Sequence, residues 1–435
     1  MPATPPLSTG RLSTGAYQRR STCRGCLSER LVSFLDYGQV PLAGDFIQPH
    51  LAGSEKVYPM DLCVCLDCSL TQILNVVDAD ELFTDYRYLS SITKTLTGHF
   101  KDYAKVLKNE VLEHADDLVV EFGCNDGVLL SPLKELGVRA IGVDAAENVV
   151  KIARGKGLHV QHGYFGQEIA GSLRADHGAA KVITASNVFA HIDNLDEVMR
   201  GVDSLLDEDG TFVVEVHYVL DLLDDVQFET VYHEHLCYYS LHSLDVLFKR
   251  FGLEVVDAER LLMHGGAIRV FGKRISQGAE RSKRSQQLFD LEQRSHLFDE
   301  SVYQQFGEKG RKVRKEIRDF VLSRKAMGRS ISGYGAAGRA TTLLNFCGLG
   351  ADVIDYVVDE SPSRIGRIVP GVQIPVVPRS HFHEQPTDDC LLTAWNYRQE
   401  IVAKEPAFLE QGGCFLAPLP EIEVIEGRTS CLKIA

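Results

Sequence analysis

Four side chains that can exchange protons stand next to one another near the middle of the chain: Tyr232, His233, Glu234 and His235. An imidazole has a pKa of about 6.5 and serves as a base at neutral pH. A neighbouring carboxylate can set its tautomer, and a phenol can donate a hydrogen bond to an oxyanion. The set therefore has the chemistry needed to remove a proton from a carbon acid. The alternative interpretation is a polar loop whose side chains are merely hydrogen-bonded.

Two imidazoles compete for the role of base. In an extended segment His233 and His235 point to one side and Tyr232 and Glu234 to the other, so alternation does not choose between the histidines. Both remain candidates at this point.

Four cysteines near the N-terminus have the spacing of a metal site. Cys23 and Cys26 form one C-x-x-C pair, and Cys65 and Cys68 form a second. Two such pairs supply four thiolates for tetrahedral Zn²⁺, and a site closed by four sulfurs leaves no position open for substrate. We therefore predict a structural zinc ion. Cys63 is the alternative ligand, and four unligated cysteines are the alternative interpretation.

A glycine turn follows a short apolar run after the N-terminal third of the chain. Residues 118–122 have the character of a buried strand, 123–127 of a tight turn and 139–144 of the next strand, which ends in an acid. The turn lacks the middle glycine of a pyrophosphate-binding sequence, which favours an adenosyl ligand without phosphate, S-adenosylmethionine. The expected cofactor-binding residues are Glu121, Gly123, Asn125, Asp126, Gly127, Asp144 and Asn187.

Further strands are expected at 181–185, 210–215, 253–258 and 267–272, the last two as an antiparallel hairpin. His191 follows the first of these strands. It is a candidate for the acceptor site, and its alternative role is that of a capping or core histidine.

The C-terminal part contains a second glycine turn. Residues 330–338 read as a strand followed by G-x-G-x-x-G, a helix is expected at 339–346, and a strand at 353–358 precedes Asp359. By motif this is a dinucleotide fingerprint, so an NAD-dependent oxidoreductase is a real alternative. Between the two glycine turns, residues 282–327 are predicted to form long amphipathic helices.

Taken in order, these motifs are specific. They are the paired C-x-x-C, Glu121-x-Gly-x-Asn-Asp-Gly127, Asn187-Val-Phe-Ala-His191, Tyr232-x-Glu-His235, His264-Gly-Gly266 and Asp359-x-x-Pro-x-Arg364. From Cys23 to the end, the chain resembles the C-methyltransferases that act on nucleotide-linked 4-keto deoxysugars in antibiotic and surface-glycan pathways. His233 is a departure, because it adds a second histidine to the central motif.

The resemblance implies an α/β fold: a class I S-adenosylmethionine-dependent Rossmann-like core, an N-terminal zinc-binding module and a C-terminal Rossmann-like domain that holds the sugar nucleotide. We expect a disordered tail at 1–20, the N-terminal module at 21–84, the middle module at 85–280 and the C-terminal module at 281–435. The resemblance implies His235 as the base, with Tyr232, Glu234, His191 and Tyr86 in the acceptor site. The substrate-binding residues that it implies are His264, Gly265, Gly335, Arg339, Asp359 and Arg364.

The composition limits the possible partners. The 435 residues include 46 basic and 60 acidic side chains, a net charge of −14, which argues against nucleic-acid binding and gives no reason to expect a membrane surface as partner. No apolar run is long enough to span a bilayer, and no secretory signal is visible. The scattered cysteines suit a cytoplasmic protein, and we expect a monomer or a weak homodimer.

The leading hypothesis is an enzyme that transfers a methyl group from S-adenosylmethionine to the carbon beside the keto group, C-3, of a dTDP-linked 4-keto-6-deoxysugar. Its alternatives are methylation at C-5 of a related nucleotide sugar, an NAD-dependent oxidoreductase that uses the C-terminal glycine turn, and a non-catalytic zinc scaffold.

Overall fold

The computed structural model describes residues 14–83, 89–92, 94–427 and 432–433. Its N-terminal part is built on a four-stranded sheet in the order β11-β4-β3-β2. The strands are β2 (Leu31–Pro41), β3 (Val57–Cys65), β4 (Thr71–Ile73) and β11 (Cys237–Tyr238), and the short helices nearby are η1 (Pro49–Leu51), α1 (Ala79–Phe83) and η2 (Ser90–Ile92). Because β11 comes from far along the chain, this sheet already joins the N-terminal module to the segment that carries the proton-exchanging side chains.

The predicted disordered tail is wrong for its last residues. Strand β1 (Tyr17–Arg19) pairs antiparallel with β5 (Asn75–Val77). Arg19 also forms an ion pair with Asp61 at 2.7 Å and donates a hydrogen bond to Asn75. This pairing with a distant segment orders residues that look like a tail in the sequence, and residues 1–13 lie outside the described part.

The middle of the chain forms a seven-stranded sheet in the order β12-β13-β10-β9-β6-β7-β8. Its strands are β6 (Leu118–Phe122), β7 (Arg139–Asp144), β8 (Val160–His162), β9 (Ala180–Ser186), β10 (Leu206–His217), β12 (Leu253–Leu261) and β13 (Ala267–Arg274). Strands β6 to β10 are parallel, and β13 is antiparallel to both neighbours. The strand predictions, including the terminal hairpin, are confirmed. The chain reverses direction across the sheet between β6 and β9, where open α/β sheets bind ligands.

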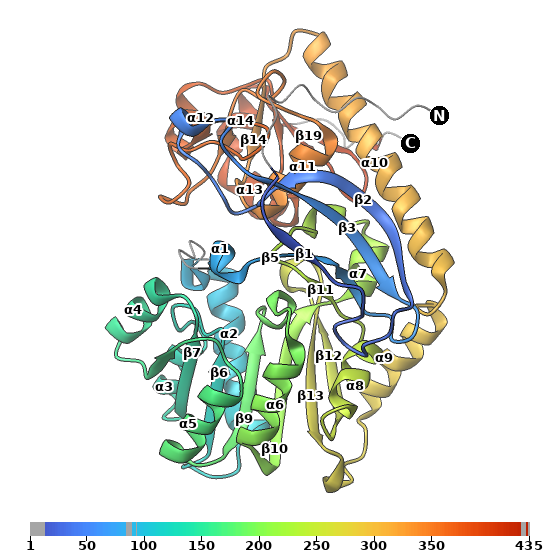
Figure 1. Cartoon of the computed structure of the whole chain (residues 1–435). Helices are drawn as coiled ribbons and strands as arrows, with labels where there is room; N and C mark the ends of the chain where they lie inside the picture. The colour runs from blue at the N-terminus through green and yellow to red at the C-terminus, as the bar shows by residue number, and fades with distance from the viewer. Residues whose placement is uncertain (1–13, 84–88, 93, 428–431, 434–435) are drawn as a thin grey trace.

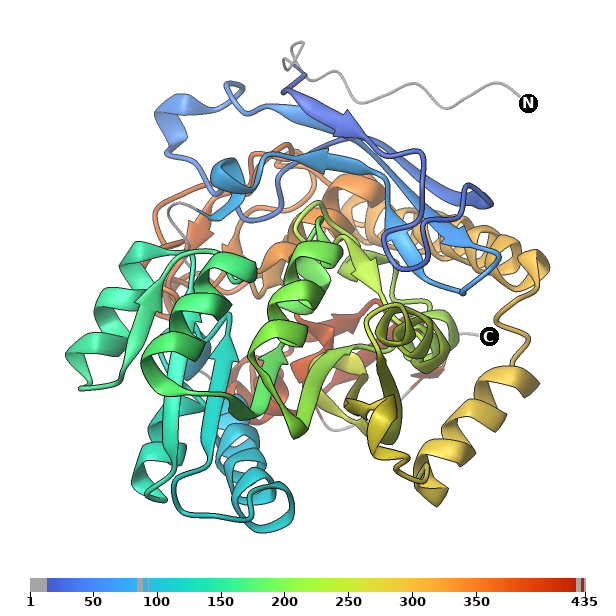
Figure 2. The same ribbon diagram turned by 60° about the horizontal axis from the view of Figure 1, so that its bottom comes forward.

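Helices cover both faces of the middle sheet (Figures 1 and 2). One face packs on α2, since Leu96, Phe100 and Tyr103 belong to one apolar cluster with Val119 and Val182. The helices of this part are α2 (Lys94–Val106), the π-helix η3 (Leu107–Val111), α3 (Leu130–Glu135), α4 (Glu147–Gly155), α5 (Gln167–His177), η4 (Phe189–His191), α6 (Leu195–Leu205), α7 (Val219–Asp224), η5 (Phe228–Thr230), α8 (Leu241–Lys249) and η6 (Met263–Gly265).

The C-terminal part holds a second seven-stranded sheet, ordered β16-β15-β14-β17-β18-β19-β20. Its strands are β14 (Ile331–Tyr334), β15 (Val357–Val358), β16 (Val376–Val377), β17 (Asp389–Leu391), β18 (Cys414–Ala417), β19 (Glu423–Glu426) and β20 (Leu432–Lys433), and its helices are α11 (Gly338–Cys347), α12 (Arg379–Glu384), η8 (Trp395–Tyr397), α13 (Arg398–Lys404) and α14 (Pro406–Glu410). The strand predicted at 353–358 is only two residues long, because β14 offers it pairing partners only at Gly333 and Tyr334.

Three helices join the two large sheets: η7 (Ile275–Gln277), α9 (Lys283–Arg294) and α10 (Glu300–Ala326). Helix α10 runs along one side of the molecule up to the C-terminal part (Figure 1). It approaches β2 so closely that a Cβ at Gly307 would lie 2.1 Å from the carbonyl oxygen of Phe34. In α9, Glu292 accepts hydrogen bonds from the backbone N–H groups of Leu241 and His242 at 2.5 and 3.0 Å, and so caps α8.

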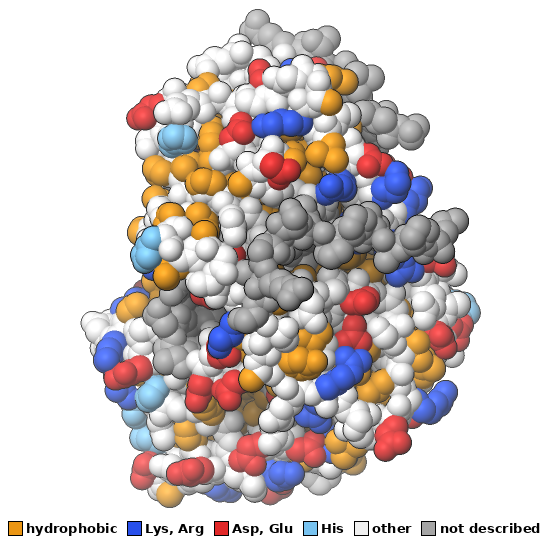
Figure 3. All heavy atoms as spheres, turned by 45° about the horizontal axis from the view of Figure 1, so that its top comes forward, with side chains coloured by type: hydrophobic (Ala, Val, Ile, Leu, Met, Phe, Trp, Pro, Cys, Tyr) orange, Lys and Arg blue, Asp and Glu red, His pale blue; other side chains and the backbone are white. Residues whose placement is uncertain are grey.

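Neither sign of charge dominates the face of the molecule seen in Figure 3. Figure 3 shows acidic and basic side chains interspersed over the face it presents. Among the described residues, no helix combines the length and the apolar character needed to cross a membrane.

Candidate active site

The glycine turn after β6 has a backbone that only small side chains permit. Gly123 and Gly127 have φ of 68° and 82°, and a Cβ at these positions would lie 2.5 Å from Val188 and 2.1 Å from Leu158. Asn125, between them, also has a positive φ of 50°. The turn is therefore held in a tight conformation at the carboxyl end of β6, as the sequence indicates.

Asp144 ties this turn to the end of β7. Its Oδ2 accepts a hydrogen bond from the backbone N–H of Asn125 at 2.8 Å, and its Oδ1 accepts one from Ala146 at 2.9 Å. Burial raises the pKa of Asp144, and these two backbone donors act against the shift. Each carboxylate oxygen keeps a further lone pair, so the geometry leaves Asp144 able to accept from ribose hydroxyls.

Buried polar atoms without a described partner gather at this edge of the sheet. They include Glu121 Oε2 in β6, Ser186 Oγ at the end of β9 and Asn187 Oδ1 just beyond it. Burial, with the nearby Asp144 and Asp126 carboxylates, raises the pKa of Glu121 well above its ordinary value. Unpaired buried polar groups are costly, so these atoms fit a polar ligand such as S-adenosylmethionine.

Asp126, in the same turn, faces inward. It accepts a hydrogen bond from Lys156, the C-cap residue of α4, at 3.0 Å and another from Ser91 Oγ. Its Oδ2 thus bonds protein groups that hold the turn in shape, while its Oδ1 is buried without a described partner.

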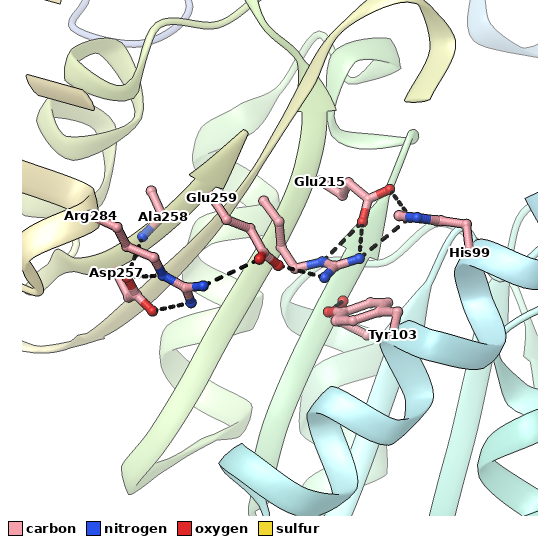
Figure 4. Close-up of polar contacts among 9 residues, drawn as sticks. His99, Tyr103, Glu215, Asp257, Ala258, Glu259 and Arg284 are labelled. Carbon is pink, nitrogen blue, oxygen red and sulfur yellow. Dashed lines mark hydrogen bonds and ion pairs between the residues drawn. The ribbon is translucent and has the colours of Figure 1, made fainter. Parts of the chain in front are cut away.

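The sequence analysis missed a row of charged side chains that crosses the α2 face of the sheet. Glu215 in β10 bonds His99 of α2 at 2.6 Å and Arg269 of β13 at 2.9 Å. Arg269 bonds Glu259 at 2.6 Å and stacks over the Tyr103 ring, and Figure 4 shows this row from α2 across to β12. The only sequence signal was a charged residue inside each of several apolar strands. The row holds α2 against the sheet that carries the glycine turn at residues 123–127.

The central motif is a turn, not an extended segment. The backbone N–H of His235 donates to the carbonyl of Tyr232 at 2.8 Å. The turn stacks the two side chains, with ring centroids 3.9 Å apart, and places Tyr232 Oη 2.8 Å from His235 Nε2. The expectation from strand alternation, that Tyr232 and His235 point to opposite sides, is therefore wrong.

The backbone sets the tautomer of His235. Its Nδ1 lies 3.0 Å from the carbonyl oxygen of Thr230, which can only accept, so Nδ1 carries the proton and donates it. In the neutral ring, Nε2 then holds the lone pair and accepts from the Tyr232 hydroxyl. The Nε2 lone pair is thus engaged by the Tyr232 hydroxyl here, and it becomes available as a base when that hydroxyl bonds another acceptor.

Two further histidines lie against His235. The ring centroid of His191 is 5.0 Å away and that of His217, the last residue of β10, is 4.9 Å away. Burial lowers the pKa of His191 to about 4, and burial together with these two neighbours lowers the pKa of His235 well below its ordinary value. His235 is thus neutral at pH 7. The sequence analysis missed His217, whose only signal was its place at the end of a core strand.

His233 and Glu234 contact two different segments of the N-terminal part of the chain. His233 Nε2 lies 3.2 Å from the carbonyl oxygen of Pro59 in β3, and burial lowers the pKa of His233 to about 4. Glu234 lies against Gly44, where a Cβ would be 2.9 Å from its Oε1. Burial raises the pKa of Glu234 to about 7, against the effects of the Gly44 N–H and Arg364.

The C-terminal glycine turn lies against the motif formed by residues 232–235. Gly335 has a φ of 102°, and a Cβ at Gly338 would lie 3.3 Å from Tyr232 Cζ. Asp359 accepts a hydrogen bond from the backbone N–H of Ala336 at 2.8 Å and lies 3.4 Å from Arg364. The N-terminus of α11 and the stacked Tyr232–His235 pair therefore share one region.

The buried carboxyl group of Glu229 joins the segment that precedes the central motif to the C-terminal part. Glu229 Oε1 accepts a hydrogen bond from Trp395 Nε1 at 2.9 Å and lies 3.5 Å from Arg339 of α11. Burial raises the pKa of Glu229, and Arg339 counteracts the shift.

Two predicted residues remain without a described side chain. Tyr86 lies outside the described residues, and the side chain of His264 is not described. The backbone of Gly265 has a φ of 89°, and its carbonyl accepts a hydrogen bond from Gln227 at 2.5 Å.

The four cysteines converge. Their Sγ atoms all lie within 4.8 Å of one another, and the Cys23–Cys68 and Cys26–Cys65 distances are both 3.5 Å. A tetrahedral zinc site with bonds of about 2.3 Å has sulfur–sulfur distances of about 3.8 Å, so this set fits Zn²⁺. Cys63 is not part of it, since its thiol bonds Asp61 at 3.3 Å and burial raises its pKa to about 12.

Comparisons with known proteins agree with this geometry. Three family models match in order: a zinc binding domain at residues 23–83, a methyltransferase domain at 100–258 and a C-methyltransferase C-terminal domain at 262–420. The C-methyltransferase NovU of Streptomyces niveus is 35% identical over 94% of this chain and 97% of its own length. This chain belongs to the C-methyltransferase family. It is an S-adenosylmethionine-dependent enzyme with a class I core and a zinc-binding N-terminal domain.

Two further matches each cover less than half of this chain. The ubiquinone biosynthesis O-methyltransferase of Xanthomonas axonopodis pv. citri is 29% identical over 23% of this chain and 42% of its own length. The solved structure of an S-adenosylmethionine-dependent methyltransferase from Anabaena variabilis covers 41% of this chain and 85% of that chain, with 15% identity and a TM-score of 0.34.

Proposed function

We propose that this C-methyltransferase acts on a dTDP-linked 4-keto-6-deoxysugar and methylates C-3, the carbon beside the keto group. The observation that supports this acceptor most directly is the meeting of the C-terminal glycine turn with the catalytic motif at Gly338 and Tyr232. Helix N-termini favour anionic phosphate groups. A nucleotide diphosphate held at the start of α11 would therefore place its sugar beside His235.

Two arginines support an anionic acceptor. Arg339, in the first turn of α11, contributes to the low pKa of His235, which places its charge near the base. Arg364 stands beside Asp359 and affects the pKa of Glu234. We assign Arg339 and Arg364, with Gly335, Asp359 and the backbone of 264–265, to the acceptor nucleotide.

On the donor side, we assign Asp144 to the ribose hydroxyls and Glu121, Asn187 and the turn at 123–127 to the remainder of the cofactor. Their unpaired or partly paired oxygens support this assignment. Bound S-adenosylmethionine supplies an electrophilic methyl group on a sulfonium. Asp126 stabilises the turn through its hydrogen bond with Lys156.

The chain's own residues then account for the proton. The carbon beside a ketone is acidic because its carbanion delocalises onto oxygen. When the keto oxygen accepts a hydrogen bond from the Tyr232 hydroxyl, that hydroxyl no longer occupies the lone pair of His235 Nε2. The lone pair can then take the C–H proton. The electron pair of that C–H bond moves into the enolate, whose carbon would form the new bond to methyl as the methyl–sulfur bond of the bound cofactor breaks and its electron pair stays on sulfur. General-base assistance of this kind contributes about 10²–10⁴ in rate.

His191, His217 and Glu234 complete the acceptor site in this proposal. The two histidines pack against the His235 ring and restrict its orientation. Glu234, with a pKa of about 7, can hold or release a proton at neutral pH on the side of the site that faces Gly44.

The test is a methylation assay with S-adenosylmethionine carrying a ¹³C methyl group and a dTDP-linked 4-keto-6-deoxyhexose. We expect one labelled product, with carbon–proton correlation spectra that place the methyl on C-3. A label on C-5 would replace the proposed position. Absence of turnover with the dTDP sugar, together with turnover of a UDP- or GDP-linked analogue, would overturn the proposed nucleotide. NAD binding without S-adenosylmethionine binding would overturn the whole assignment.

We place the enzyme in the cytoplasm as a monomer or weak homodimer. Among the described residues no cysteine is in a disulfide, which suits a reducing compartment.

A further inference from the structure

Arg24, the residue after the first cysteine of the metal cluster, is completely buried. Its Nε donates to Asp193 Oδ1 at 2.9 Å, and its Nη1 donates to the carbonyl oxygen of Ile73 at 2.5 Å. The side-chain carbonyl of Gln72 accepts from the Arg24 backbone N–H at 3.2 Å, while its amide donates to Cys23 Sγ at 3.2 Å. A fully buried guanidinium with its charge paired to a distant carboxylate is costly to build for packing alone.

Its partner Asp193 belongs to the acceptor side of the enzyme. Asp193 lies in the loop between β9 and α6, two residues after His191, and the next residue, Asn194, caps α6 through Glu197. His191 in turn packs against His235, with ring centroids 5.0 Å apart. The Arg24–Asp193 pair therefore connects the cysteine cluster to the loop that carries His191.

The same module also holds the other side of the His191–His235 contact. Strand β4 pairs with β11, so that Gln72 lies opposite Cys237. The backbone N–H of Ile73 donates to the carbonyl of Leu236 at 3.0 Å, directly after His235. Besides Asp193, Arg24 contacts Gln72 and Ile73, so Arg24 lies between the anchors of His191 and His235.

We infer that Arg24 is a positioning residue for methyl transfer, through which the metal-loaded cysteine cluster sets the placement of His191 against His235. The backbone at 23–28 turns around the cluster, with the N–H of Leu27 donating to the carbonyl of Cys23 at 3.0 Å. Loss of the metal opens this turn and withdraws Arg24 from Asp193, which then keeps its contact with Arg20, whose Nη1 lies 3.2 Å from Asp193 Oδ2. The zinc site therefore affects the reaction without contacting the methyl donor or the sugar acceptor. This inference rests on the roles proposed above for His191 and His235.

The test compares Arg24→Met and Asp193→Asn with the wild type and with Arg30→Met. Arg30 forms an ion pair with Asp67 in the same module, but that pair is exposed and contacts no acceptor-site segment. We expect kcat to fall about 10–10²-fold in the first two variants, the scale for a misplaced catalytic group. Cofactor KM and zinc content remain at the wild-type values, and Arg30→Met behaves as wild type.

Hydrogen–deuterium exchange supplies a readout without turnover. In Arg24→Met, Asp193→Asn and zinc-depleted wild type, amide exchange should speed up in peptides covering 187–194 and 232–239. Peptides covering β6 to β8, on the donor side, should exchange as in the loaded wild type. Arg30→Met should match the wild type throughout.

The outcomes separate this inference from the proposed function. A wild type without turnover on any keto sugar contradicts the proposed acceptor, while the exchange experiment still tests the positioning role. Unchanged kcat and unchanged exchange at 187–194 in Asp193→Asn, whose half-exposed side chain tolerates an amide, overturn the inference. If Arg24→Met loses zinc or fails to fold, Asp193→Asn decides the question alone.

Discussion

Replacing His235 by Gln should remove the base while leaving the fold intact. In the proposed mechanism the Nε2 lone pair, set by the Thr230 carbonyl and hydrogen-bonded to Tyr232, is the proton acceptor, and an amide cannot replace it. Loss of a general base lowers kcat by about 10²–10⁴, which corresponds to about 3–5 kcal/mol of transition-state stabilisation at 1.36 kcal/mol per factor of ten.

His233→Gln is the matched control. Its imidazole bonds Pro59 in the N-terminal sheet and packs on the Tyr58 ring, with centroids 5.6 Å apart, away from Tyr232. Its loss removes one buried hydrogen bond, worth about 0.5–1.5 kcal/mol of stability, and should leave kcat within about twofold, since that bond contacts no reacting group.

Two assays report the difference. The first is steady-state methyl transfer under saturating cofactor and acceptor. The second follows exchange of the acceptor's C-3 proton into D₂O without a usable methyl donor, which isolates proton removal. We expect wild type and His233→Gln to exchange this proton and His235→Gln to exchange it at least about 10²-fold more slowly. Normal exchange and turnover in His235→Gln would refute the assignment and move the base role to His233, Tyr232 or His191.

Three further results follow from the same geometry. Cys65→Ser should lower the zinc content measured by elemental analysis, and Cys63→Ser should not, because Cys63 bonds Asp61; equal zinc in both variants would contradict the ligand set. Asp144→Ala should weaken cofactor binding by about 1.5–3 kcal/mol in calorimetry, the scale for a hydrogen bond to a charged group, and an unchanged affinity would exclude its ribose role. Burial raises the pKa of Glu292 from 4.5 to about 7, so the folded state keeps a proton that the unfolded state releases, and stability is lost as pH rises from about 4.5 to 7. Denaturant unfolding at pH 5 and 8 should show a smaller loss in Glu292→Gln than in wild type; equal losses would contradict this pKa.

The strands and the metal ligands could be predicted from short stretches of sequence. Residues 118–122 and 139–144 are apolar runs bounded by turn residues, and such runs form buried strands wherever the fold places them. The two C-x-x-C pairs likewise carry their chemistry in their own spacing, which closes two sulfurs on one ion. The nature of residues 232–235 indicated proton chemistry in the same local way.

Tertiary contacts decided what local pattern left open. His233 and His235 are two residues apart and chemically identical, and only the Pro59 carbonyl on one side and Thr230 with Tyr232 on the other give them different environments. His217 joined the site because β10 ends beside the central turn.

The sequence by itself determined the order of the modules, the zinc ligands and the kind of chemistry, because each depends on residues close together in the chain. The tertiary structure alone decided which groups surround each imidazole and how Arg24 reaches Asp193, 169 positions away. Burial and hydrogen-bond partners set the pKa and the tautomer of a side chain, and these arise only when distant segments pack together.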